Sequence, residues 1–368
     1  MANFRRKIFY LSGYDPRGAR FYHQLYGEQA SIYAANTGKD IAVSKREQDD
    51  AGNTSWTVAN KTDEVETEFT ALGWNDVIRA TWDKNPLRLF WGAIASTLSF
   101  SWGWEWGKYA RHIPMGTFIA FYYPALSVVI LPIILISLIW LVAGPLIAII
   151  LGAGISYFAA RYIQSLWLLR FVIFNDRYAR GEEIPHLDAR VASMAETIEK
   201  ALDEDWDEVL VVTHSNGSIL AMPIMQRLLA KHKGKMPDNF ALMTLGSCIP
   251  LVGIRGDAKP FRAVLEDVAM GNFLWLDLGS LTDGACIPLV DPCVTCATDH
   301  RPEQHVLSPR WFKYCDPATY NQRRRNKYEV HFEYLRTFDR ISPLDYLRVT
   351  SCGEPLSASI AAFENAKD

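Results

Sequence analysis

Ser215 is the residue whose surroundings in the sequence most clearly suggest chemistry. A continuous apolar, β-branched run at 209–212 precedes it, and a helical pattern from about 218 to 231 follows it. Such a run is typical of a central parallel strand. The N-terminus of a helix offers backbone N–H groups and a positive dipole end to a developing oxyanion. Ser215 is therefore a candidate nucleophile, and the alternative is a structural Ser-Asn-Gly turn.

The run Thr213-His214-Ser215-Asn216-Gly217 resembles the nucleophile elbow of the α/β-hydrolase superfamily, whose pattern is small-x-Ser-x-small. In that family a strained turn lifts the serine hydroxyl above the sheet. Thr213 departs from the pattern, because the family usually has glycine there. The resemblance implies a lipase- or esterase-like serine hydrolase that forms an acyl-serine intermediate, with no cofactor and no metal.

The resemblance also implies an oxyanion hole with two backbone donors. The family usually takes one donor from a loop after an early strand. Residues 11–16 resemble such a loop, and Gly13 would let the backbone approach the substrate. By analogy the donors are the N–H groups of Tyr14 and Asn216. An ordinary turn glycine is the alternative reading of Gly13.

Three carboxylates are candidates for the acid of a triad, which in this family follows the serine in the chain. Asp283, in the run Asp-Gly-x-x-x-Pro, resembles the lipase-type acid loop and is the first choice. Asp277 is second because it is nearer a strand predicted at 273–276, and Asp291 is third. Turn-forming aspartates beside Gly or Pro are common, so each has a structural alternative.

The base must follow the acid and reach the serine hydroxyl. His331 is the first choice, because it lies where the last loop and helix of the family would fall. His305 is second, and both His305 and His300 are predicted to lie in a proline-rich polar loop. His214 is adjacent to the nucleophile and is expected to point elsewhere. A packed core histidine is the alternative role for His331.

The alternation of helix and strand patterns predicts an α/β fold with a mostly parallel sheet, with helices on both faces and a hydrophobic helical insertion. The resemblance implies that this fold is α/β-hydrolase-like. Strands are expected near 7–11, 41–44, 56–59, 209–212, 241–245 and 273–276. Asp188 is expected to cap a helix. We divide the chain into N-terminal hydrolase residues 1–83, a membrane insertion at 84–180, C-terminal hydrolase residues 181–350 and a tail at 351–368.

The insertion has no Asp, Glu, Lys, Arg or His from residue 113 to residue 160. One transmembrane helix needs about 20 apolar residues, and this run is about twice as long. Two spans, at about 117–138 and 141–160, therefore fit better than one, with the break between Ser137 and Pro145. A helical hairpin buried in a soluble cap is the alternative, although soluble helices rarely lack charge over such a length.

Residues on both flanks of the insertion suggest how it is oriented. Lys108 and Arg111 precede it, and Arg161 and Arg170 follow it. Basic residues at both ends place both ends on the cytoplasmic side of a cytoplasmic (inner) membrane. The tryptophan-rich segment 87–106 is expected to lie along the membrane surface.

Composition bounds the remaining possibilities. The formal net charge of −3 gives no bulk attraction to nucleic acid, and we expect no nucleic-acid partner. Cys293 and Cys296 form a C-x-x-C, but no second pair with zinc-site spacing follows, and we expect buried thiols.

The expected substrate is a lipid-like acyl ester. An acyltransferase using the same triad and a non-catalytic membrane scaffold are the alternative functions.

Overall fold

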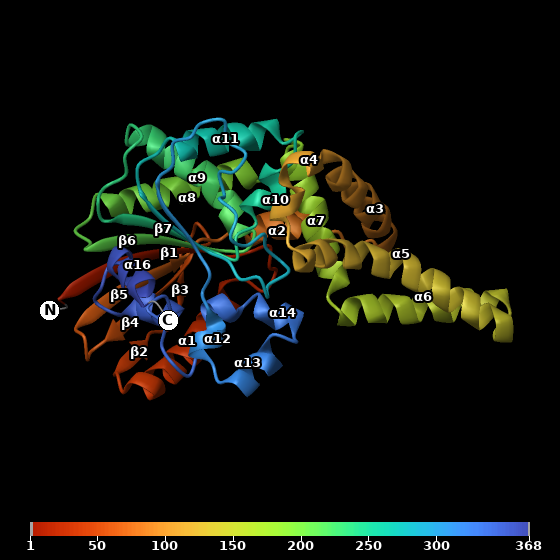
Figure 1. Ribbon diagram of the computed structural model, residues 1–368, viewed down its shortest axis with the longest axis horizontal. Helices are drawn as coiled ribbons and strands as arrows, with labels where there is room; N and C mark the ends of the chain where they lie inside the picture. Colours follow the sequence, from red (N-terminus) through yellow and green to blue (C-terminus); the bar gives the residue numbers. More distant parts are fainter. Residues whose placement is uncertain (1–2, 367–368) are drawn as a thin grey trace.

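A mixed sheet runs through the body of the protein, whose structure is a computed structural model that describes residues 3–366 (Figure 1). The strands are β1 (Phe4–Leu11), β2 (Ile41–Val43), β3 (Glu47–Gln48), β4 (Thr54–Asn60), β5 (Val65–Ala71), β6 (Glu208–His214), β7 (Phe240–Leu245), β8 (Leu274–Leu278) and β9 (Glu303–Leu307).

Helices cover both faces of this sheet and also form a long projection. The α-helices of the N-terminal half are α1 (Ala19–Thr37), α2 (Asn75–Thr81), α3 (Pro86–Gly103), α4 (Trp106–Tyr109), α5 (Met115–Ala143), α6 (Pro145–Tyr162), α7 (Ser165–Ala179) and α8 (Leu187–Leu202). Those of the C-terminal half are α9 (Gly217–Lys231), α10 (Ile249–Gly253), α11 (Lys259–Ala269), α12 (Trp311–Tyr314), α13 (Pro317–Arg323), α14 (Lys327–Val330), α15 (Tyr346–Ser351) and α16 (Leu356–Asn365).

The strand order confirms the predicted α/β class with a mostly parallel sheet. The order is β2-β4-β5-β1-β6-β7-β8-β9, and every pair from β5 to β9 along it is parallel. The antiparallel partners β2, β3 and β4 lie at one edge. Because β1 is bonded to both β5 and β6, segments from before and after the insertion share one sheet. All the parallel strands end at the same edge, where the candidate site lies.

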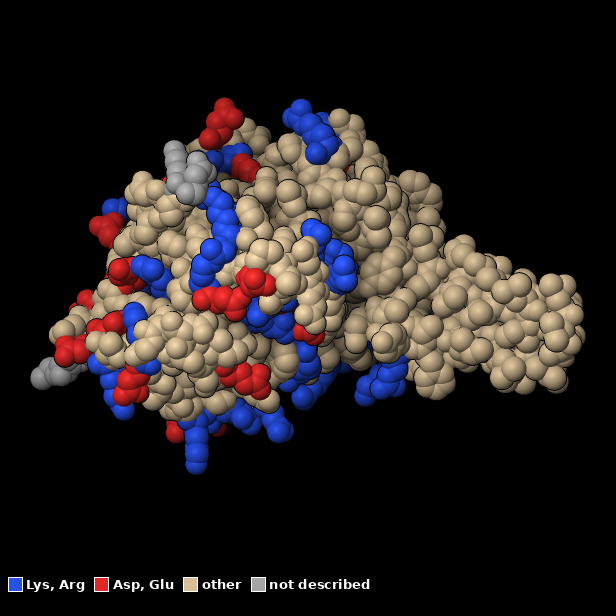
Figure 2. Space-filling view, turned by 60° about the horizontal axis from the view of Figure 1, so that its bottom comes forward, with Lys and Arg blue, Asp and Glu red and all other residues tan. Residues whose placement is uncertain are grey.

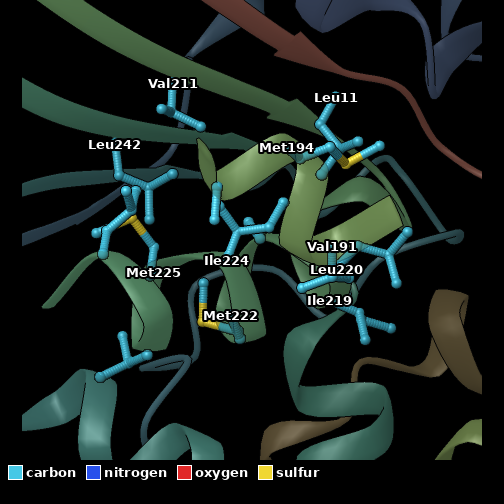
Figure 3. Packing of buried hydrophobic residues seen from close by; sticks show 14 of the residues in the cluster. Leu11, Val191, Met194, Val211, Ile219, Leu220, Met222, Ile224, Met225 and Leu242 are labelled. Atoms are coloured by element: carbon cyan, nitrogen blue, oxygen red, sulfur yellow. The ribbon is translucent and has the colours of Figure 1, made fainter. Parts of the chain in front are cut away.

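Alternation along the central strands explains why both faces of the sheet are covered. Val209 and Val211 of β6 face the cluster formed with α8, α9 and α11, whereas Leu210 and Val212 face the cluster formed with α1, α15 and α16. Figure 3 shows the first cluster, in which Met222 and other α9 side chains meet the strands. Burying each large apolar side chain stabilises the fold by roughly 1.5–3 kcal/mol.

Helices α5 and α6 form a hairpin that extends away from the body (Figure 1). Both are long and apolar enough to cross a membrane. Figure 2 shows the projecting part without Lys, Arg, Asp or Glu, and its large apolar side chains are exposed. The two predicted apolar helices are therefore present, and the break between them is at Gly144, which has φ of 80°. Pro145 then occupies the first position of α6, where its missing N–H costs no hydrogen bond.

Close helix packing holds the hairpin together and ties it to the body. A Cβ on Gly152 of α6 would be 2.6 Å from Cγ1 of Ile136 on α5, so the two backbones approach closely. The first turns of α5 pack against the body, where Thr117, Phe121 and Ala125 are buried. About 18 residues of α5 lie beyond Ala125, and α6 has 18. At 1.5 Å per residue each arm is about 27 Å long, close to the roughly 30 Å of a bilayer core.

Two local expectations were wrong. Asp188 does not cap α8, because the helix begins at Leu187 and places Asp188 in its first turn. Residues 351–368 were expected to be a tail, but α16 buries Leu356, Ile360 and Phe363 in the core. The tryptophan-rich segment, which is predicted to lie along the membrane surface, exposes Trp102 (81%), whereas Trp104 is buried and its indole N–H donates to the Leu251 carbonyl.

Candidate active site

Ser215 occupies a strained turn between β6 and α9. Its φ is +57°, a left-handed conformation that is rare for residues other than glycine. The turn is fixed by a hydrogen bond of 2.9 Å from the Ser215 N–H to the Leu245 carbonyl at the end of β7. A Cβ on Gly217 would come within 2.3 Å of the Leu11 carbonyl oxygen, so only glycine fits there. Strand β1 is thus held directly against the turn that carries Ser215.

The hydroxyl of Ser215 lies among small groups at the carboxyl edge of the sheet. A Cβ on Gly13 would be 2.9 Å from Ser215 Cβ and 3.2 Å from its Oγ, so the loop after β1 passes directly over the serine. The Cys248 Sγ is 3.9 Å from Ser215 Oγ. Burial raises the pKa of Cys248 to about 12, which keeps this neighbour a neutral thiol. Ser215 is itself largely buried, with 9% exposure.

Asp283 and His331 form a hydrogen-bonded pair. The distance from His331 Nδ1 to Asp283 Oδ2 is 2.8 Å, and the Ala285 N–H donates to Asp283 Oδ1 at 2.9 Å. Asp283 is buried, which by itself would raise its pKa, but the interactions with His331 and the hydrogen bonds it accepts together outweigh this and lower the pKa of the carboxyl. A carboxylate that accepts a hydrogen bond from the Nδ1–H group leaves Nε2 as the basic nitrogen of a neutral imidazole. His331 Nε2 is buried and has no hydrogen-bond partner within residues 3–366.

Two contacts place this pair beside the serine turn. The rings of His331 and His214 are 4.7 Å apart, and His214 Nε2 lies 2.7 Å from the His331 carbonyl oxygen. A Cβ on Gly246 would be 3.3 Å from both His331 Cε1 and Asp283 Oδ2. Gly246 follows Leu245, the hydrogen-bond partner of Ser215. No hydrogen bond joins His331 Nε2 to Ser215 Oγ in the described structure; such bonds often tighten only when substrate is bound.

The other histidines lie in different settings. His214 is buried, and burial lowers its pKa to about 3, so it stays neutral at physiological pH. His305 was expected in a loop but lies in strand β9, where its Nδ1 is 3.0 Å from Glu364. This edge strand was not predicted because the sequence of β9 is polar. His300 is in a loop with its Nδ1 2.7 Å from the Ala269 carbonyl oxygen.

The alternative acids also lie in different settings. Asp277 was expected after its strand but is inside β8, where it accepts a hydrogen bond from the Thr244 hydroxyl. Asp291 pairs with Arg301 at 2.7 Å. Among the three carboxylates considered, Asp283 is therefore the one hydrogen-bonded to a histidine.

Asp277 should give the protein a distinctive pH dependence. Burial raises its pKa to about 7, whereas an unfolded aspartate titrates near 4. The folded state therefore binds this proton more tightly, and stability is lost as the pH rises from about 4 to about 7. The Tm of Asp277→Asn relative to that of wild type should consequently be higher at pH 8 than at pH 4. Thermal unfolding in detergent at both values tests this, and an equal difference in Tm at the two pH values would contradict it.

The predicted oxyanion donors flank the serine. Within the described residues, the backbone N–H groups of Tyr14 and Asn216 donate to no protein acceptor. The Tyr14 carbonyl accepts a 2.6 Å hydrogen bond from the Trp167 indole at the start of α7. This contact, which joins residues 153 positions apart, fixes the loop that carries Tyr14. Trp167 was not singled out from the sequence, because nothing local indicates its partner.

The loop that carries Asp283 is joined to the apolar hairpin of α5 and α6. The Thr117 hydroxyl of α5 donates to the Cys286 carbonyl at 2.6 Å. A Cβ on Gly284 would be 2.9 Å from the Gly116 carbonyl oxygen and 3.0 Å from Ala120 Cβ. The residue after Asp283 must therefore be small for the first turns of α5 to pack here. The base of the hairpin is thus in direct contact with the loop that holds the carboxylate.

Cys248 is a site residue that the sequence reasoning did not identify. It lies just beyond β7, the strand next to β6, so its closeness to Ser215 depends on the pairing of these two strands. The C-x-x-C thiols are free, and Cys293 is buried. Among residues 3–366, no group of three His, Cys, Asp or Glu side chains could hold a metal ion.

Comparison with known proteins adds no further identification. No family model, no curated protein and no solved structure matches the chain.

Proposed function

We propose that the protein is a membrane-anchored serine hydrolase with an α/β-hydrolase-like fold that cleaves an ester through an acyl-serine intermediate. The observation that carries this proposal is the Asp283–His331 hydrogen bond of 2.8 Å beside a serine held at φ +57°. A serine on a strained strand-to-helix turn, a histidine and a carboxylate that orients it are the groups this chemistry requires.

In the proposed reaction Ser215 Oγ attacks the ester carbonyl carbon while His331 Nε2 takes the hydroxyl proton. The N–H groups of Tyr14 and Asn216 stabilise the oxyanion. Collapse of this intermediate breaks the bond to the leaving alcohol, which receives the proton from His331. Water then attacks the acyl-serine and gives its proton to His331, and the carboxylic acid is released as Ser215 regains its proton. Asp283 orients His331 and stabilises its charged form throughout.

The hairpin supports a lipid-like ester as the substrate. Its exposed apolar arms match the thickness of a bilayer core, and its base contacts the acid loop through Thr117 and Gly284. An ester held at the membrane surface would therefore be close to Ser215. Basic residues flank the hairpin at both ends, which favours a body on the cytoplasmic side of the membrane.

Acyl-enzyme formation tests the proposal. The full-length protein in detergent, mixed rapidly with p-nitrophenyl butyrate, should release about one equivalent of p-nitrophenolate in a burst before steady turnover. Mass spectrometry should find the butyryl group on the peptide that contains Ser215. Folded protein that releases no p-nitrophenolate and carries no acyl group would contradict the proposal. Adding a primary alcohol then separates hydrolysis, which yields butyrate, from transfer, which yields a butyrate ester.

A further inference from the structure

A basic cavity lies at the carboxyl edge of β1 and β5. It is beside the loop after β1 that carries Gly13 and Tyr14, which we call the oxyanion loop. Its volume is about 200 Å³, and its lining includes Ser12, Arg17, Arg20 and Arg46. No Asp or Glu is among the residues that line it. A cavity of this size is smaller than the 300–1,000 Å³ typical of sites for whole drug-sized ligands, so it suits a headgroup. The positive charge of its lining favours an anionic headgroup.

The three arginines differ in how they are held. Arg17 donates to Asp15 with Nη2–Oδ2 of 2.6 Å and Nε–Oδ2 of 2.9 Å, so its guanidinium is fixed in place by a buried carboxylate. Arg20 and Arg46 are exposed, and within residues 3–366 neither side chain has an ion pair or hydrogen bond. Two positive charges in this cavity therefore have no protein counter-ion.

The N-terminus of helix α1 lies at the same cavity. Its first residues, with Gly18 as the N-cap, are part of the lining. No side chain caps this helix and no acidic residue lies in its first turn. The positive end of a 19-residue helix thus meets unpaired arginines, a combination that favours phosphate.

The cavity is close to the reactive serine along the chain and in space. Ser12 lines it, and the next residue, Gly13, packs against Ser215. Trp74, another lining residue, donates its indole N–H to the Ser12 carbonyl at 3.2 Å. A ligand group in the cavity and an ester at Ser215 would therefore both lie next to the loop that carries Gly13.

We propose that this cavity binds the phosphate of an acylated phosphomonoester whose ester bond is cleaved at Ser215. The cleavage of the ester at Ser215 rests on the proposed hydrolase function, whereas phosphate binding does not depend on it. The substrate class is then an acyl glycerol phosphate, an anionic lipid that the hairpin would meet in the bilayer.

Binding is tested on the full-length Ser215→Ala protein in detergent, so that activity does not enter. Calorimetry with glycerol 3-phosphate should detect binding, and the double variant Arg20→Gln/Arg46→Gln should weaken it by about 10- to 100-fold, the effect expected for charge-assisted hydrogen bonds. The double variant Arg88→Gln/Arg325→Gln removes the same charge from exposed positions outside the cavity and should bind like the parent. Absence of binding, or equal binding in both double variants, would overturn the proposal.

Inorganic phosphate is the second probe, and it separates a lipid headgroup from a free ion. Tighter binding of glycerol 3-phosphate than of inorganic phosphate supports the headgroup, whereas preference for inorganic phosphate overturns the substrate assignment. With Ser215 intact, Arg20→Gln/Arg46→Gln should lower kcat/KM for a lysophosphatidic acid by at least about tenfold and leave an uncharged monoacylglycerol unaffected. Binding without any hydrolysis would reject the hydrolase function but not the phosphate site.

Discussion

Replacing Asp283 with Asn should lower kcat for ester hydrolysis by about 10⁴-fold, the scale seen when a triad carboxylate becomes an amide. The carboxylate accepts a hydrogen bond from the Nδ1–H group of His331, which leaves Nε2 basic. An amide can donate to Nδ1 instead, which places the proton on Nε2 and removes the base. Because Asn is nearly isosteric with Asp, the protein should stay folded. Steady-state kinetics with p-nitrophenyl butyrate and circular dichroism measure the two effects.

Asp277→Asn is the matched control for this variant. Both carboxylates are buried, but Asp277 lies inside β8 and bonds to Thr244 and not to a histidine. Its replacement should change kcat less than about tenfold. If Asp277→Asn lost activity and Asp283→Asn kept it, the acid would be wrongly assigned and the Asp283–His331 pair would be structural.

Introducing three arginines into the hairpin should detach the protein from membranes. Ile130, Ile134 and Leu138 are all exposed on the projecting part of α5. An arginine at the centre of a membrane span costs about 2.5–3.5 kcal/mol, so the triple variant disfavours insertion by roughly 9 kcal/mol. The protein should move from the carbonate-resistant membrane fraction to the soluble or aggregated fraction.

Replacing the same three residues with valine gives the control, which should remain in the membrane fraction because its apolar surface is retained. A triple arginine variant that still resists carbonate extraction would show that the hairpin does not enter the hydrocarbon core. The exposed apolar surface would then need a protein partner to cover it.

The central strands and the insertion could be predicted because their signals are local. The run at 209–212 is buried on both faces in β6, and such a strand has to be apolar throughout. The absence of charge from 113 to 160 likewise predicts the two apolar helices, since any ionised group in that surface is costly in lipid. Strands β5 and β9 were missed because they contain polar residues, including Glu66 and Glu303.

Asp283 and His331 were chosen from their order in the chain, and the structure places them in contact across 48 positions. Cys248 and Trp167 could not be identified in the same way. The position of Cys248 depends on the pairing of β7 with β6, and the contact of Trp167 with Tyr14 depends on how α7 returns from the hairpin. Tertiary packing of this kind leaves no local pattern in the sequence.

Labelling with a fluorophosphonate probe tests the central claim, which is that Ser215 is an activated nucleophile. Membrane fractions containing wild type, Ser215→Ala and Ser31→Ala would be compared, since Ser31 is an exposed serine on α1 and controls for loss of a hydroxyl. We expect wild type and Ser31→Ala to be labelled and Ser215→Ala to be unlabelled. Folded wild-type protein that takes no label, or a Ser215→Ala protein labelled as strongly as wild type, would contradict the hydrolase assignment.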